Sequence, residues 1–318
     1  MRKILATLLT FVLVMSASIT AFGATKNDVD KTLESSLKFA YGDKKSFDVS
    51  ESKDYYLYLC AGGSDEKIKE SYLNSVKKAL DGGEKFDVGT LALIINSIKL
   101  SHENPTDFKG YNLVDLFGKT ELGEFDNLYT YMYASDIALL FNFETLEKKL
   151  CDAMVSKYTK GVGTDFWGGW GTSPDDLSVF IITLSVCNED YKDYIDDAVA
   201  LLKSYNTEAG YDNYGANANS TAMALAAYAS IDEKELADDA YNKLMLFYNK
   251  ETGGFNSNYD DVLATKDAIY GLSNYRSLAD TDDTSDKEEK PTNPIVSIKD
   301  KNDTNNEKKE NEARPPEK

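Results

Sequence analysis

The stretch TAMALAAYAS, residues 221–230, is apolar on nearly every side of a helix and therefore predicts a helix that is buried all round. Asn219 and Ser220 precede it, and both residue types cap helix N-termini well. The next segment, 233–250, has a different pattern, because its apolar residues recur at spacings of three and four with Lys and Asp on the other face. It predicts a surface helix. The two segments show the two kinds of helix that alternate along the chain.

Short loops that carry Gly, Asp and an aromatic residue recur along the chain at a nearly constant period. The spacings between successive loop aromatics are 39, 39, 45, 41 and 44 positions, and these aromatics are Phe47, Phe86, Phe125, Trp170, Tyr211 and Phe255. A fixed period of this length is typical of a repeat architecture built from two-helix units.

Each loop separates a polar-faced helix from a more apolar one. The predicted polar-faced helices cover 27–41, 64–81, 106–118, 143–159, 190–205 and 233–249. The predicted apolar helices cover 50–61, 88–100, 127–141, 175–187, 219–230 and 261–273. No segment has the alternating pattern of a strand, so the fold class is all-α.

Six hairpins in strict alternation predict an (α/α)6 toroid, in which the apolar helices form a closed ring and the polar-faced helices surround it. An open solenoid of stacked hairpins gives the same pattern and is the alternative. Closure is favoured because the apolar helices are apolar all round and neither end carries a polar capping repeat. A closed ring requires contacts between 27–61 and 233–273.

The two ends of the chain differ from the repeat domain, residues 24–278. Arg2 and Lys3, an apolar run and a small-residue segment have the layout of a secretory signal peptide over 1–23, with cleavage after Gly23 or Ala24. Residues 279–318 contain 12 acidic and 8 basic residues and four of the six prolines, so we expect a disordered, charged spacer. We therefore predict a secreted or cell-surface protein with no membrane span in the mature chain.

Charge and cysteine content narrow the possible partners. The chain carries a net charge of −19, and the domain without its ends carries −17, which disfavours nucleic acid and anionic lipid. Cys60, Cys151 and Cys187 all lie in apolar helical patterns and are interpreted as small buried side chains. A bridge between Cys151 and Cys187 stays open.

Residues 253–255, Gly-Gly-Phe, followed by ATKDAIYGL at 264–272, resemble the repeat of the terpenoid cyclase and protein prenyltransferase superfamily. Residues 167–170, Trp-Gly-Gly-Trp, leading to Asp176-Leu177, and Tyr211 leading to residues 220–222, look like two more copies. The resemblance implies the α/α toroid fold, which serves many functions.

The catalytic motifs of that superfamily are not matched at usable positions. The sequence DTDD at 280–283 imitates the acidic motif of the cyclases but lies in the charged tail, where no dry cavity could hold a proton donor. The zinc site of the prenyltransferases needs a histidine; the sole histidine, His102, is expected at the exposed end of a helix, and no cysteine sits near a loop where it could share a metal with it. The sequence identifies no cofactor and no metal site.

The predicted ligand site lies where the loops open at one end of the hairpins. Carboxylates and aromatic rings alternate there, a combination that suits sugars, quaternary amines or peptides. The residues are Asp165, Trp167, Trp170, Asp176, Tyr211, Asp212, Tyr214, Phe255, Tyr259 and Asp260. We expect a non-catalytic protein that binds a neutral or polar ligand or a surface partner. The alternative is a secreted carbohydrate-active enzyme, a glycoside hydrolase or lyase, that uses loop carboxylates.

Overall fold

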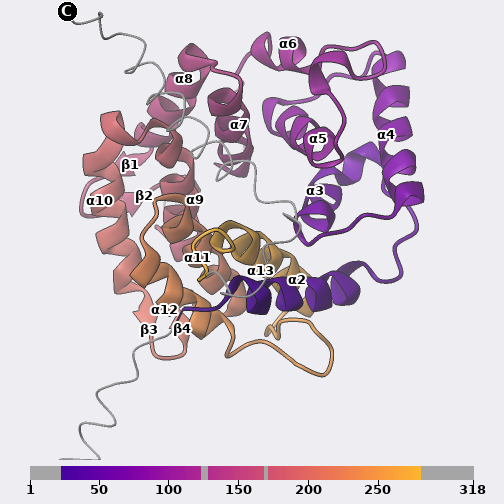
Figure 1. Cartoon of the computed structure of the whole chain (residues 1–318). Helices are drawn as coiled ribbons and strands as arrows, with labels where there is room; N and C mark the ends of the chain where they lie inside the picture. The colour runs from indigo at the N-terminus through magenta and orange to yellow at the C-terminus, as the bar shows by residue number, and fades with distance from the viewer. Residues whose placement is uncertain (1–22, 123–127, 168–170, 281–318) are drawn as a thin grey trace, which may run out of the picture.

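The computed structural model describes residues 23–122, 128–167 and 171–280, and the chain is mostly helical within them (Figure 1). Residues 1–22 of the predicted signal peptide and residues 281–318 of the predicted tail lie outside the described residues, as do Phe125 and Trp170. No helix in the described part of the chain is long and apolar enough to cross a membrane.

Six helices, which we call the central helices, carry most of the core. They contact one another in chain order, and the last also contacts the first. They are α3 (Ser52–Cys60), α5 (Val88–Leu100), α7 (Leu128–Leu140), α9 (Pro174–Leu184), α11 (Ala218–Ser230) and α13 (Asp261–Tyr275). Each of the six predicted apolar helices is thus present, within a few residues of its expected bounds.

In the described part of the chain, six further helices lie outside the central ones (Figure 1). They are α2 (Lys26–Tyr41), α4 (Glu66–Asp81), α6 (Leu113–Gly118), α8 (Glu144–Val155), α10 (Asn188–Ser204) and α12 (Lys234–Leu244). Short 3-10 helices add Val49–Glu51, Pro105–Asp107 and Ser185–Cys187. The burial patterns of α4 and α12 match the sequence, because only one stripe of each faces the core.

The absence of strands and three helix bounds were predicted wrongly. Two antiparallel hairpins are present, β1 (Tyr158–Thr159) with β2 (Gly163–Thr164) and β3 (Asn206–Thr207) with β4 (Gly210–Tyr211). They are too short to give an alternating pattern. The first of them ends α8 four residues early, and α12 also stops at Leu244.

The predicted helix 106–118 is interrupted because Lys109 and Gly110 both adopt positive φ angles, 49° and 93°. Phe108 and Tyr111 pair across this turn instead, and the helix begins only at Leu113.

The first helix lies beside the last pair, as the sequence predicted. α2 contacts α13, and the guanidinium of Arg276 binds the Asp30 carboxylate with Nε···Oδ1 at 2.6 Å. The Ser36 hydroxyl donates to the Gly253 carbonyl at 3.1 Å. These contacts join residues about 220 to 250 positions apart.

A group of aromatic rings fills the space between α3, α7 and α13 around one carboxyl group. Tyr56 and Tyr133 meet edge to face at 6.0 Å, and Tyr133 and Tyr270 do so at 6.3 Å. Asp136 is fully enclosed beside them, and burial raises its pKa well above the ordinary value. We call Tyr56, Tyr133, Asp136 and Tyr270 the interior cluster.

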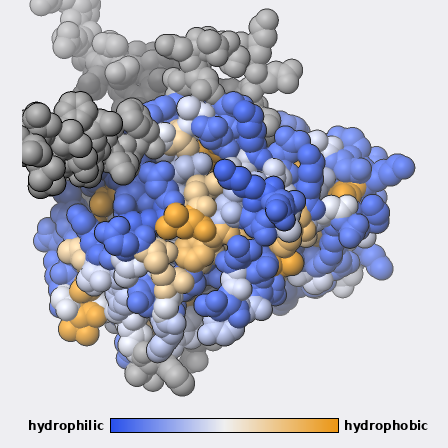
Figure 2. Space-filling view, turned by 90° about the horizontal axis from the view of Figure 1, so that it is seen from below, coloured by the Kyte–Doolittle hydropathy of each residue, from blue (hydrophilic) through white to orange (hydrophobic). Residues whose placement is uncertain are grey.

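The cysteines lie mostly inside the fold, as their apolar surroundings in the sequence predicted, and the surface is mostly polar. Cys60 and Cys151 are buried and Cys187 is half-buried, and all three are free. The Cys187 thiol donates to Glu147 Oε1 at 3.0 Å. The face in Figure 2 is mostly hydrophilic, with a short apolar band across its middle.

Candidate functional site

A cleft of about 610 Å³ opens between the loop that precedes α9 and the segment that runs from the end of α10 to the loop after β4. Its lining combines aromatic rings, carboxylates, an amide and hydroxyl groups. The lining residues are Trp167, Gly171, Thr172, Ser173, Asp176, Ser204, Tyr205, Thr207, Asp212, Asn213 and Tyr214. This size is within the usual range of small-molecule sites.

One wall is organised by a hydrogen bond between Trp167 and Asp176. The indole Nε1–H donates to Asp176 Oδ1 at 2.9 Å, and Trp167, which lines the cleft, is 49% exposed. Ser173 caps α9 by accepting a bond from the backbone N–H of Asp176 at 3.1 Å. Burial raises the pKa of Asp176 above its ordinary value, and the bonds from Trp167 and Ser173 offset part of that rise. The carboxylate therefore orients the indole ring.

The opposite wall is tied to the first by two hydrogen bonds. The Tyr205 hydroxyl donates to the Thr172 carbonyl at 3.0 Å, and the Asn213 side-chain amide donates to Asp175 Oδ2 at 3.3 Å. Asp212 closes its own loop, because its Oδ1 accepts from the Gly215 N–H at 2.8 Å. Tyr214 projects from this loop and is 94% exposed. The cleft is thus held at a fixed width with a free aromatic ring at its edge.

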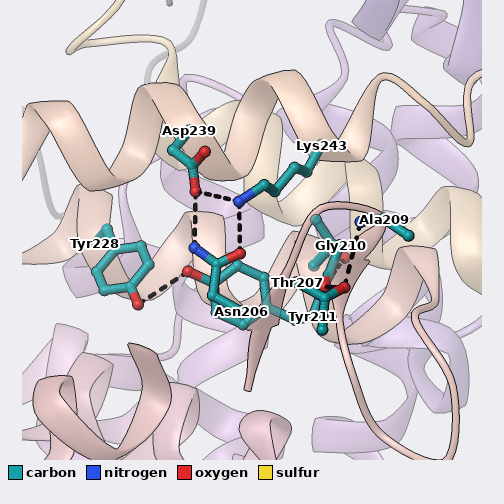
Figure 3. A network of polar contacts seen from close by, with 9 residues as sticks. Asn206, Thr207, Ala209, Gly210, Tyr211, Tyr228, Asp239 and Lys243 are labelled. Carbon is teal, nitrogen blue, oxygen red and sulfur yellow. Dashed lines mark hydrogen bonds and ion pairs between the residues drawn. The ribbon is translucent and has the colours of Figure 1, made fainter. Parts of the chain in front are cut away.

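The hairpin β3–β4 beneath this wall is fixed to α11 and α12 (Figure 3). Asn206 donates to Asp239 Oδ2 at 2.8 Å and accepts from Lys243 at 2.7 Å, while Lys243 also pairs with Asp239. The Tyr211 hydroxyl donates to that of Tyr228 at 3.0 Å. The cleft residues Tyr205 and Thr207, on either side of Asn206, therefore belong to a segment that α11 and α12 hold in place. This suits a preformed site.

The structure brings together four of the ten residues that the sequence predicted, namely Trp167, Asp176, Asp212 and Tyr214. Asp165 does not line the cleft, and its backbone N–H donates to the Lys157 carbonyl at 2.9 Å. Trp170 lies outside the described residues.

Two predicted residues have to be corrected, since Tyr211 and Phe255 are completely buried and cannot touch a ligand. Their rings pack on Tyr228 and Tyr248 inside the hairpins. Tyr259 and Asp260 belong to the separate loop before α13, where Asp260 accepts bonds from the first backbone N–H groups of the helix. Neither of these two lines the cleft.

Sequence reasoning missed Tyr205, Asn213 and Thr172. Tyr205 follows the last turn of α10, and no pattern in the sequence shows that this helix end meets the loop before α9. Asn213 stands between two predicted site residues and could have been included on that ground. Only the folded arrangement identifies Thr172, because its carbonyl is the group that Tyr205 binds.

A second pair of acids lies beside the cleft, toward the central helices. The pKa of Asp175 is raised to about 6, chiefly by burial; the Ser220 hydroxyl offsets part of the rise, and the Asp267 carboxylate on α13 contributes to it. Asp175 Oδ1 and Ser220 Oγ are both enclosed. Within the described part of the chain, neither of these two oxygen atoms has a hydrogen bond of regular geometry. Asp267 accepts from the Asn219 amide at 2.8 Å.

The described residues contain no group of three or more His, Cys, Asp or Glu side chains that could hold a metal ion. No protein-family model matches the chain, and no curated protein is significantly similar to it.

Proposed function

We propose that this chain is an exported, non-catalytic binding protein, and that its cleft takes a neutral, hydroxyl-rich ligand such as an oligosaccharide. The observation that carries this proposal is the half-exposed Trp167 ring, held in place by the buried Asp176 carboxylate. A fixed indole face next to hydrogen-bonding groups suits a sugar ring, whose two faces are apolar and whose edge carries hydroxyl groups.

The proposed architecture is an (α/α)6 toroid related to the repeats of the terpenoid cyclase and protein prenyltransferase superfamily. Support comes from the order of contacts among the central helices, in which α13 meets α3, and from the regular alternation of outer and central helices. The proposed export rests on the leader-like residues 1–23, and the charged residues 279–318 would serve as a spacer.

The charge of the site supports a neutral ligand. Asp176 and Asp212 both face the cleft, and no Lys or Arg is among the described residues that line it. Two carboxylates without a neighbouring cation disfavour a free anion but accept hydrogen bonds from hydroxyl groups. Asn213, Thr207 and Ser204 add both donors and acceptors.

The proposal is tested by a thermal-shift screen of neutral oligosaccharides, because a ligand that binds the folded state raises its melting temperature. Trp167→Ala should remove the shift caused by any sugar that binds. Tyr259→Ala is the control, since this residue is also an exposed aromatic but lies outside the cleft. Binding that survives Trp167→Ala, or no response to any sugar, would contradict the proposal.

A secreted carbohydrate-active enzyme is the second candidate, and the environment of Asp175 favours it. A buried carboxyl whose pKa is raised to about 6 is suited to act as a general acid near neutral pH. In that case Asp175→Asn should abolish turnover of a bound sugar while leaving its affinity within about threefold. If a sugar binds to the unmodified protein but is never cleaved, the enzyme proposal is contradicted and the non-catalytic binding function is supported.

A further inference from the structure

The first described residues lie in a polar niche between α12 and α13. Ala24 is only 7% exposed, and its backbone N–H donates to the Tyr275 hydroxyl oxygen at 3.2 Å. The Tyr275 hydroxyl in turn donates to Asp238, which is 8% exposed. The Ala24 carbonyl accepts from the Asp280 N–H at 3.0 Å. The backbone nitrogen of Ala24 is therefore connected to a buried carboxylate through a single hydroxyl group.

Asp238 also reaches the residue before Ala24. A Cβ atom added at Gly23 would lie 2.7 Å from Asp238 Oδ1, so the Asp238 carboxylate would have to move to admit any larger residue there. The peptide bond between Gly23 and Ala24 consequently lies next to the carboxylate. It is also one of the two bonds at which the leader is expected to be cleaved.

Among the described residues, the charges in this niche are not balanced. Lys234 pairs with Asp238 at 3.0 Å and with Asp280 at 3.3 Å, so one ammonium group serves two carboxylates. A second positive charge at the position of the Ala24 nitrogen would complete the balance. A buried carboxylate is stabilised most when its partners are charged donors.

We propose that cleavage after Gly23 creates an ammonium group on Ala24 that binds Asp238 and Tyr275 and fixes the start of α2 to α12 and α13. Hydrolysis of this peptide bond consumes one water and leaves a carboxylate on Gly23 and an ammonium on Ala24. The uncut amide offers one neutral donor, whereas the ammonium offers three donors and a charge. This inference rests on the export part of the proposed function, not on the ligand. Removal of the leader then strengthens the contact between the first and last helices.

The test compares two forms of the processed chain, one with a free Ala24 amino group and one with that group acetylated. Acetylation should lower the melting temperature by about 2–8 °C, since it removes the charge and two donors. In Asp238→Asn, acetylation should have almost no effect, because the partner charge is already gone. Asp239→Asn is the matched control: it disturbs the neighbouring pair with Lys243 and should leave the acetylation effect intact.

If acetylation lowers the melting temperature by the same amount in the unmodified protein and in Asp238→Asn, the proposed ion pair between the Ala24 ammonium and Asp238 is contradicted. If Asp238→Asn does not fold, the rate at which an acylating reagent modifies the Ala24 amino group decides the matter. That rate should be about tenfold lower in the folded protein than in urea, and equal rates would contradict the proposal. N-terminal sequencing of the chain exported by a bacterial host should give Ala24. Another first residue would place the failure in the cleavage step and leave the ligand proposal untouched.

Discussion

The interior cluster and the cleft each place a carboxyl group among aromatic rings, but they treat it in opposite ways. Asp136 has no hydrogen-bond partner for either oxygen within the described part of the chain, although it is almost completely buried. Asp176 is nearly as buried, yet it accepts a bond from the Trp167 indole. Burial raises the pKa of both groups, so the difference lies in the partners.

This difference separates a region built for packing from the cleft in which we propose that a ligand binds. An unpaired carboxylate in the core costs far more than a neutral carboxyl group, so burial favours the protonated form of Asp136 and raises its pKa. Asp176 can carry its charge because Trp167 and the helix N-terminus stabilise it. Only the second arrangement keeps a polar group available at the surface.

Packing and exposure also differ between two tyrosines of one loop, and their substitution gives the largest expected difference in stability. Tyr211 is fully buried against Tyr228, whereas Tyr214 is 94% exposed. Tyr211→Ala should lower the free energy of unfolding by about 3–5 kcal/mol, because it leaves a cavity and removes the partner of a buried hydroxyl. Tyr214→Ala should stay within about 0.5 kcal/mol of the unmodified protein. Urea unfolding of both variants measures their free energies of unfolding. Similar losses of stability in the two variants would show that Tyr214 also packs on the domain.

Exchange of each carboxyl group for an amide should shift stability in opposite directions. The pKa of Asp136 is raised in the folded state, so as pH rises the unfolded chain releases its proton first and the folded protein loses stability. Asp136→Asn removes this loss and should stabilise the protein at pH 8 by about 1–3 kcal/mol, with little effect below the pKa of the unfolded chain.

Asp176→Asn provides the other half of that experiment. It exchanges a charged acceptor for a neutral one at the Trp167 indole and should cost about 1 kcal/mol at the same pH. Denaturant unfolding at pH 4 and pH 8 measures both variants. A destabilised Asp136→Asn at pH 8 would mean that the carboxyl group has a partner, such as a buried water molecule.

The central helices could be predicted from the sequence, because burial on all sides leaves a continuous apolar run. α5 and α11 match their predicted bounds to within one residue. The break before α6 could not be predicted in the same way, since Lys109 adopts a positive φ that its residue type does not announce. Local patterns fix where a helix can form, and tertiary contacts decide where it stops.

The candidate site was predictable only in part for a related reason. Periodicity identifies the loops, but Tyr211 and Tyr214 have the same residue type and differ in exposure only because β4 turns one ring toward α11. Tyr205 enters the site through a contact between segments 33 positions apart. A single sequence shows that aromatic and acidic residues gather in these loops, and it does not show which of them face outward.

The smallest expected effect concerns the bond between Trp167 and Asp176 itself. The chain has two tryptophans, so the variant Trp170→Phe leaves Trp167 as the sole source of indole emission. Burial raises the pKa of Asp176, and the emission of Trp167 should therefore change with a midpoint above the ordinary pKa of an aspartate. As pH falls through that midpoint, the carboxylate gains a proton and its charge-assisted bond to the indole weakens.

Asp176→Asn in the same background should abolish the transition, while Asp212→Asn should retain it, since Asp212 bonds to Gly215 instead. Circular dichroism over the same pH range must stay constant, so that acid unfolding does not account for the signal. A transition that persists in Asp176→Asn would mean that another group titrates near Trp167, and the contrast with the interior cluster would then no longer rest on this bond.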